Sequence, residues 1–202
     1  MTRLVDRGAL VAAGVGVGMG VTIAASFLLV IPIEPIYWLL ALPAGLLIGY
    51  YANQRSDRRA GPWPRIVSNS VAAGAATGLT MAALLLVIKV LFFFGDSGYP
   101  DFNRVDPGSH QVVPPLCDTG AGCVYARYLA QGSGAELSAA GIRDVAGFTG
   151  FYWGQQLSAA GTVLALTLAG ALGGGVLYGV FRPKITRATR SLTADGQAGG
   201  GT

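Results

Sequence analysis

The sequence predicts an all-α membrane protein whose four transmembrane helices form two consecutive hairpins. Three observations predict it: long stretches of the 202-residue chain are almost free of charge, only 12% of the residues are charged, and one long polar segment interrupts the apolar pattern. About 20 apolar residues cross a hydrocarbon core of about 30 Å, so each stretch can hold a span. The expected spans are residues 9–31, 36–52, 66–94 and 156–181.

The first span must be distinguished from a cleavable signal peptide. Arg3 and Arg7 precede its apolar run, and the small residues at 24–26 resemble a cleavage site. The apolar run continues to Ile31, beyond the length of a typical signal-peptide core. We therefore expect a retained anchor.

The other elements follow in order along the chain. Pro35 suits the first turn of the second span, because that turn has no use for the missing N–H. Residues 1–94 then hold the first three spans, with a short N-terminal segment and a loop at 53–65. Residues 95–155 form the polar segment, 156–181 the fourth span, and 182–202 a glycine-rich tail expected to be disordered.

Basic residues beside the spans predict the orientation, because cytoplasmic loops carry more Arg and Lys. On one side lie Arg3, Arg7, Arg55, Arg58, Arg59, Arg65, Arg182, Lys184, Arg187 and Arg190; on the other lie Arg104, Arg127 and Arg143. Both termini are therefore expected in the cytoplasm, with the plasma membrane as the location and the polar segment outside the cell.

Glycines four residues apart occur in every expected span. This spacing leaves a groove on one helix face where another backbone can approach closely. The predicted packing residues are Gly14, Gly18, Gly45, Gly49, Gly74, Gly78, Gly170, Gly174, Gly175 and Gly179. They predict a compact bundle. Spans one and four carry two such pairs each, the second pair of span one being Gly16 and Gly20. This favours a further contact with a protein partner or a second copy, with internal packing as the alternative.

The two hairpins also echo one another. Residues 11–14 and 71–74 both read Val-Ala-Ala-Gly, an offset of sixty, and Gly45 and Gly49 align with Gly175 and Gly179 at an offset of 130. Parallel repeats are one interpretation. Chance matching in a chain rich in Ala, Gly and Val is the other.

Ionisable residues are nearly absent from the expected spans, which contain no Asp or Glu. A proton-driven carrier usually needs a titratable group there, so this class is disfavoured. Lys89 is the exception. Its long stem is expected to bring the charge to the outer interface, with Glu34 as a plausible ion partner.

Cys117 and Cys123 are the two cysteines, and both lie in the polar segment. Outside the cell an oxidising environment favours a disulfide between them. A metal site or free thiols are the alternatives. His110 is the single histidine, and these residues match no established ligand spacing, so we expect no metal.

Two short helices lying on the membrane surface are expected after Cys123. Val124, Tyr125, Tyr128 and Leu129 suggest the first of them, and the second is suggested by Leu137, Ile142, Val145 and Phe148. Aromatic residues then precede the fourth span, as in an interfacial belt.

The sequence shows no carboxylate pair, metal cluster or nucleophile with a base, so we expect no enzyme and no cofactor. Basic residues at span ends, rather than along one face, argue against nucleic acid. The expected partners are the lipid bilayer and a protein or second copy. The leading hypothesis is a non-enzymatic scaffold or accessory subunit of a membrane complex. The alternative is a small channel or carrier, built from a dimer of two-hairpin repeats, with its site near Pro43 and residues 173–175.

Overall fold

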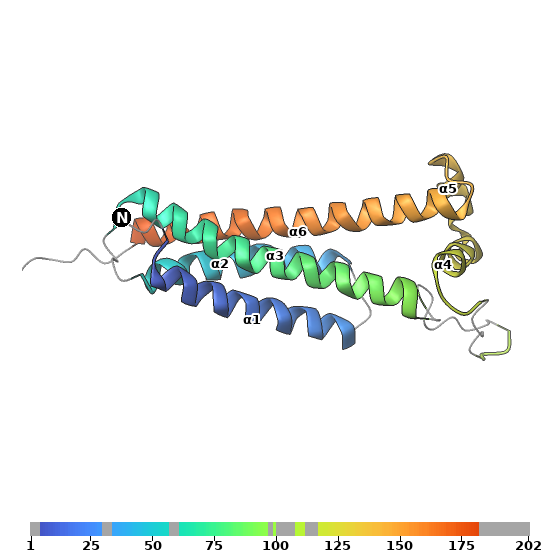
Figure 1. Ribbon diagram of the computed structural model, residues 1–202, viewed down its shortest axis with the longest axis horizontal. Coiled ribbons are helices and arrows are strands. Elements are labelled where there is room, and N and C mark those ends of the chain that lie inside the picture. Colours follow the sequence, from blue (N-terminus) through green and yellow to red (C-terminus); the bar gives the residue numbers. More distant parts are fainter. Residues whose placement is uncertain are drawn as a thin grey trace, which may run out of the picture.

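The computed structural model describes residues 5–29, 34–56, 61–96, 99, 108–111 and 117–181, and all the regular structure in them is helical. Four long helices lie side by side as an elongated bundle (Figure 1): α1 (Arg7–Leu29), α2 (Glu34–Gln54), α3 (Trp63–Gly95) and α6 (Val145–Phe181). The short helices α4 (Ala121–Tyr128) and α5 (Gly134–Ala139) are joined by a π-helical turn, η1 (Leu129–Ser133).

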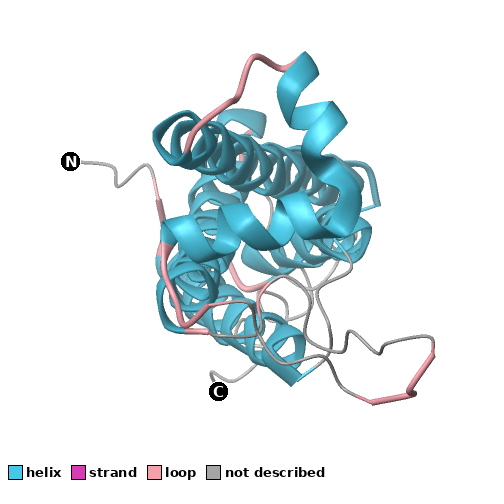
Figure 2. Cartoon of the chain, turned by 90° about the vertical axis from the view of Figure 1, so that its right-hand side faces the viewer, coloured by secondary structure: helices cyan, strands magenta, loops and turns pink. Residues whose placement is uncertain are grey.

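The short helices lie at one end of the bundle, where α3 ends and α6 begins (Figure 1). Seen from that end, they lie across the long helices (Figure 2). We call this end, formed by residues 92–96, 99 and 117–153, the head. The opposite end, where α1 and α3 begin, is the base.

Three of the described helical segments are long and apolar enough to cross a membrane: Arg7–Ser26, Trp63–Gly95 and Val145–Phe181. The predicted all-helical membrane protein is thus confirmed at this level. The α2 helix is not among the three. The predicted turn between the first two spans covers residues 32–35. The α2 helix already begins at Glu34, while residues 32 and 33 and the predicted tail at 182–202 lie outside the described residues.

The α6 helix begins at Val145, eleven residues before the fourth span predicted at 156–181. Asp144 accepts a hydrogen bond from the Gly147 N–H at 2.7 Å, which caps the earlier start. The predicted second short helix is also different. The α5 helix ends at Ala139, and Val145 and Phe148 belong to α6. The first short helix is confirmed as α4.

The closest helix contact joins α2 and α6, which run in the same direction. A Cβ on Gly45 would collide with the Thr167 carbonyl, and one on Gly170 would collide with the Leu42 carbonyl. One turn further on, Gly49 meets the Ala171 carbonyl and Gly174 meets the Leu46 carbonyl. Only glycine allows two helix backbones to approach this closely.

The α2–α6 contact is reciprocal. Gly45 is equivalent to Gly170, and Gly49 to Gly174, so equivalent residues lie 125 positions apart in the sequence. Leu42 and Thr167, whose carbonyls lie against Gly170 and Gly45, are also 125 positions apart. The sequence echo at an offset of 130 therefore pairs different glycines from those that are equivalent in the structure.

The α1 helix packs mainly on α3. A Cβ on Gly16 would overlap the Thr77 hydroxyl, and Gly20 lies against Thr80 and Met81. The core on the base side is built from small residues and one larger one: Ala9, Ala12, Ile48, Ala52 and Ala73. Small side chains hold three helices close together near the base.

Candidate functional site

Two groups of buried polar residues lie at opposite ends of the bundle. At the base, Asp6 precedes α1 and its carboxylate accepts a hydrogen bond from the Ala9 N–H at 3.2 Å, which caps that helix. The same carboxylate accepts hydrogen bonds from the Ser56 hydroxyl and from the Asn69 amide, the latter at 3.2 Å. Arg65 Nε lies 3.9 Å from it. Asp6 therefore ties the start of α1 to the end of α2 and the start of α3.

A second part of the base network lies between α2 and α3. Asn53 donates hydrogen bonds to the Ser70 hydroxyl at 2.8 Å and to the Gly49 carbonyl at 2.9 Å. Its amide also reaches the Ile66 carbonyl at 3.3 Å. Ser70 in turn lies where a Cβ on Gly175 of α6 would collide with it. Asn53 and Ser70 are fully buried, so their polar atoms are satisfied within the protein.

The environment of Asp6 changes its ionisation. Burial on its own would raise the pKa of the carboxyl group, because it disfavours the charged form. The hydrogen bonds from Ser56, the Ala9 N–H and Asn69, with the nearby Arg65, outweigh burial and hold the pKa of Asp6 below its ordinary value. The carboxylate is therefore ionised at neutral pH and acts as the central acceptor of the base network.

The head contains an aromatic core between the ends of α3 and α6 and the short helices. Phe93 and Tyr152 lie with ring centroids 4.6 Å apart, and Tyr125 packs on Phe148 at 5.2 Å. The buried members of this core are Phe93, Tyr99, Val124, Leu137, Ile142, Phe148 and Tyr152. The first turns of α6 thus serve as one wall of the head.

Cys117 and Cys123 form a disulfide in the structure, with Cα atoms 5.5 Å apart. Arg127, one turn after Cys123, is buried and donates hydrogen bonds to the Tyr99 carbonyl at 3.0 Å and to the Cys117 carbonyl at 3.1 Å. This guanidinium joins the disulfide loop to the turn that follows α3.

Lys89 lies near the head and only 6% of its side chain is exposed. Its Nζ is 6.0 Å from the centre of the Tyr99 ring. The Tyr99 and Tyr152 hydroxyls are hydrogen-bonded to each other at 2.9 Å. The long stem of Lys89 therefore brings its charge toward the polar edge of the aromatic core.

Gln156 of α6 lies at about the same level along the bundle as Lys89 of α3. Phe93 meets Tyr152, and one helical turn toward the base from these two residues leads to Lys89 on α3 and to Gln156 on α6. Gln156 is 4% exposed, and its Oε1 has no hydrogen-bond partner. The sequence analysis missed Gln156, because a single glutamine in an apolar helix carries no motif.

Glu34, the predicted partner of Lys89, is the first residue of α2, and only its backbone is described. Asn53 and Ser70 fix the α2–α3 register. Glu34 lies 19 residues before Asn53 on α2, and Lys89 lies 19 residues after Ser70 on the antiparallel helix α3. The two backbones therefore lie at the same level, and the ion pair itself stays a prediction.

The predicted packing glycines occupy different surroundings. Four of them lie against the backbone of a neighbouring helix: Gly45, Gly49, Gly170 and Gly174. Four others lie against side chains: Gly74 against Ala171, Gly78 against Leu164 and Thr167, Gly175 against Ser70, and Gly179 against Trp63. Gly14 and Gly18 have no atom within 4 Å of an added Cβ. Spacing alone could not separate the glycines used inside the bundle from those facing outward.

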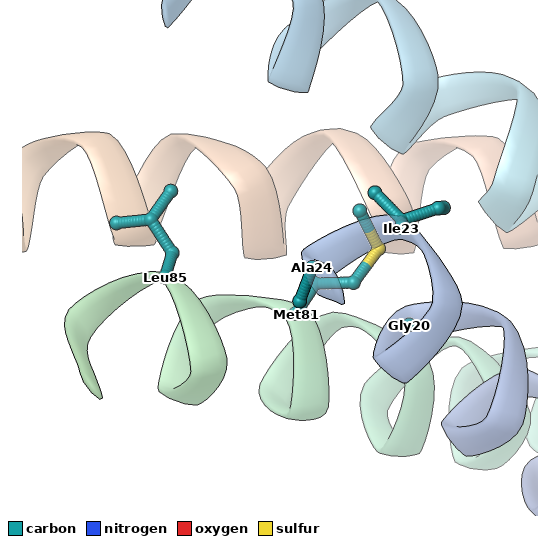
Figure 3. A pocket seen from close by; sticks show the side chains of 5 residues that line it. All are labelled: Gly20, Ile23, Ala24, Met81 and Leu85. Carbon is teal, nitrogen blue, oxygen red and sulfur yellow. The ribbon is translucent and has the colours of Figure 1, made fainter. Parts of the chain in front are cut away.

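A shallow crevice opens between α1 and α3 (Figure 3). Gly20, Ile23 and Ala24 of α1 and Met81 and Leu85 of α3 line it. It offers no hydrogen-bonding side chain, so it lacks the convergent polar groups typical of a substrate site.

Within the described residues, no three or more His, Cys, Asp or Glu side chains are grouped as metal ligands would be. Comparison of the chain with protein-family models, with curated proteins and with solved structures finds no match.

Proposed function

We propose that this protein is a four-span, non-enzymatic scaffold or accessory subunit that binds another protein within the plasma membrane. In this proposal α2 crosses the membrane together with α1, α3 and α6, both termini are cytoplasmic and the head is extracytoplasmic. The sequence supports the orientation, since ten Arg and Lys residues flank the spans on the side of the termini and three lie in the polar segment.

The observation that carries the proposal is the unused glycine face of α1. Gly16 and Gly20 pack on α3, whereas Gly14 and Gly18 face open space. Val11 and Val15 flank the open glycines and are about half exposed, at 46% and 49%. Within a bilayer, helices associate through close packing at small residues, and such a face suits a further transmembrane helix.

The buried polar groups support a structural role over a transport role. The base network links α1, α2 and α3 through satisfied hydrogen bonds, and the glycines of α2 and α6 bring those backbones into direct contact. The channel or carrier alternative has less support. Pro43 is exposed on α2, facing away from the bundle interior, and α2 continues through it.

Affinity purification of the full-length protein from native membranes after cross-linking tests the proposal. We expect a stoichiometric partner, or a second copy, that is retained by the wild type and lost with Gly14→Leu/Gly18→Leu. Gly161→Leu is the matched control, because Gly161 also has no atom near an added Cβ but lies on α6. A monodisperse monomer without partners would contradict the proposal. Solute flux in proteoliposomes would favour the channel or carrier.

A further inference from the structure

Two exposed arginines come from neighbouring stretches of backbone at the base. Arg7 begins α1, and Arg55 directly follows the end of α2. Gly8 brings the two backbones together, because a Cβ at this position would collide with the Arg55 carbonyl. A residue without a side chain permits this approach. The fold therefore places two exposed cationic residues, from two different helices, next to each other.

The guanidinium of Arg55 is held by its own helix. Its Nε donates a hydrogen bond to the Tyr51 hydroxyl at 3.1 Å, and its central carbon lies 5.7 Å from the centre of the Tyr51 ring. This contact uses one of the five N–H donors of the guanidinium and does not involve the two terminal NH₂ groups. The planar fork that these groups form matches two oxygens of a phosphate.

The charge of the two arginines is not cancelled by the base network. Among the described residues, Asp6 is the one acid at the base. Its carboxylate is the central acceptor of that network and lies 3.9 Å from Arg65 Nε, so an arginine inside the network already balances its charge. Arg7 and Arg55 therefore add two positive charges to the surface of the base.

The surface changes its character step by step toward this cationic patch. Leu47, Tyr51 and Arg55 lie four residues apart, and the Arg55 N–H continues the helical pattern by donating to the Tyr51 carbonyl at 3.0 Å. They therefore share one face, on which Leu47 is 61% exposed. On α1, Leu10 is 63% exposed and follows Arg7 by one turn. This order, from aliphatic through aromatic to cationic, is the order of a phospholipid from its acyl chains to its phosphate.

We propose that Arg7 and Arg55 form a binding site for the headgroup of an anionic phospholipid. The terminal NH₂ groups of Arg55 bind oxygens of the phosphodiester, and the acyl chains lie along Leu47 and Leu10. Arg7 supplies a second positive charge, which favours a headgroup of net negative charge and repels the quaternary ammonium of a zwitterionic one. The site does not involve the glycine face of α1, so this proposal and the proposed function can fail separately.

Titration of the detergent-solubilised, full-length protein with lipid tests the site. Native mass spectrometry measures the dissociation constants of phosphatidylglycerol and phosphatidylcholine. We expect the wild type to prefer phosphatidylglycerol, and Arg7→Gln and Arg55→Gln each to weaken its binding about fivefold, the contribution of one arginine at a membrane surface. Binding of phosphatidylcholine should not change. Both side chains are exposed, so each variant should keep the thermal midpoint of the wild type.

Arg143→Gln is the matched control, because Arg143 is an exposed cation at the opposite end of the bundle. Its phosphatidylglycerol affinity should equal that of the wild type. An equal loss in this variant would show that the lipid responds only to the net charge of the chain, and would overturn the proposal. So would wild-type affinity in the Arg7→Gln/Arg55→Gln protein. Inorganic phosphate is titrated in parallel, and displacement of the lipid at equal concentration would assign the patch to a soluble anion instead.

Discussion

Gly45 of α2 and Gly170 of α6 are equivalent residues on the two sides of one helix contact. Each lies against a backbone carbonyl of the other helix, Thr167 for Gly45 and Leu42 for Gly170. The α2–α6 contact thus has the self-complementary form of an interface between two identical helices, although it lies within one chain.

The first prediction is that substitution of either glycine lowers the free energy of unfolding by a similar amount. Gly45→Ala and Gly170→Ala should each lower the free energy of unfolding by about 1–3 kcal/mol, because the added methyl group forces the backbones apart. Gly161→Ala should be neutral or stabilising, by up to about 1 kcal/mol, since alanine favours the helix and the site is open. Thermal unfolding in detergent measures the three changes. A large effect at one glycine and none at the other would contradict the reciprocal contact.

The base network predicts a pH dependence. Because the pKa of Asp6 is lower in the folded protein than in the unfolded chain, its contribution to stability is complete above about pH 4. It is lost as the pH falls through the folded-state pKa, when the carboxylate binds a proton. The thermal midpoint should therefore fall on acidification below about pH 4, and less steeply in Asp6→Asn.

Asp144→Asn is the control for this pH dependence. Asp144 also caps a helix, but it is exposed and lies directly before α6. Asp6→Ala should in addition cost about 1 kcal/mol at neutral pH through loss of the α1 cap. An acid slope that is identical in the wild type and Asp6→Asn would show that Asp6 is not the titrating group.

The third prediction concerns Arg127 and the disulfide. Arg127→Met and Cys117→Ser/Cys123→Ser both act on the same contact, between the guanidinium and the Cys117 carbonyl. Their effects on head stability should therefore be non-additive, with a coupling of about 1 kcal/mol. Trp153 fluorescence, followed during thermal unfolding, reports on the head because Trp153 packs on Phe93 at 5.4 Å.

Arg143→Met is the matched control for that cycle. Arg143 is an exposed cation near the start of α6, so its loss should be additive with loss of the disulfide. If the stability losses from Arg127→Met and from removal of the disulfide also add to within about 0.5 kcal/mol, the guanidinium and the disulfide act independently.

Local signals were sufficient for part of the fold. Apolar stretches predicted the helical membrane protein, and the position of Cys117 and Cys123 in the polar segment predicted their pairing. The full length of α6 was not predicted, because hydropathy marks apolar stretches. It does not mark where packing of Phe148 and Tyr152 continues the same helix into the head.

The buried polar groups required tertiary structure. Asp6 lies 50 residues before Ser56 and 63 residues before Asn69 in the sequence. Each of the three looks like an ordinary polar residue near a helix end. Gly14 and Gly18 were similarly indistinguishable from Gly45 and Gly49, because a four-residue spacing defines a face without saying which helix covers it.

The α6 helix runs without a break through 37 residues, a length of about 55 Å. One end of α6 therefore packs in the aromatic core of the head, and its other end packs against Trp63 and Ser70 near the base. A single helix thus connects the two ends of the bundle directly, so the short helices of the head are joined to the base through one continuous hydrogen-bonded backbone.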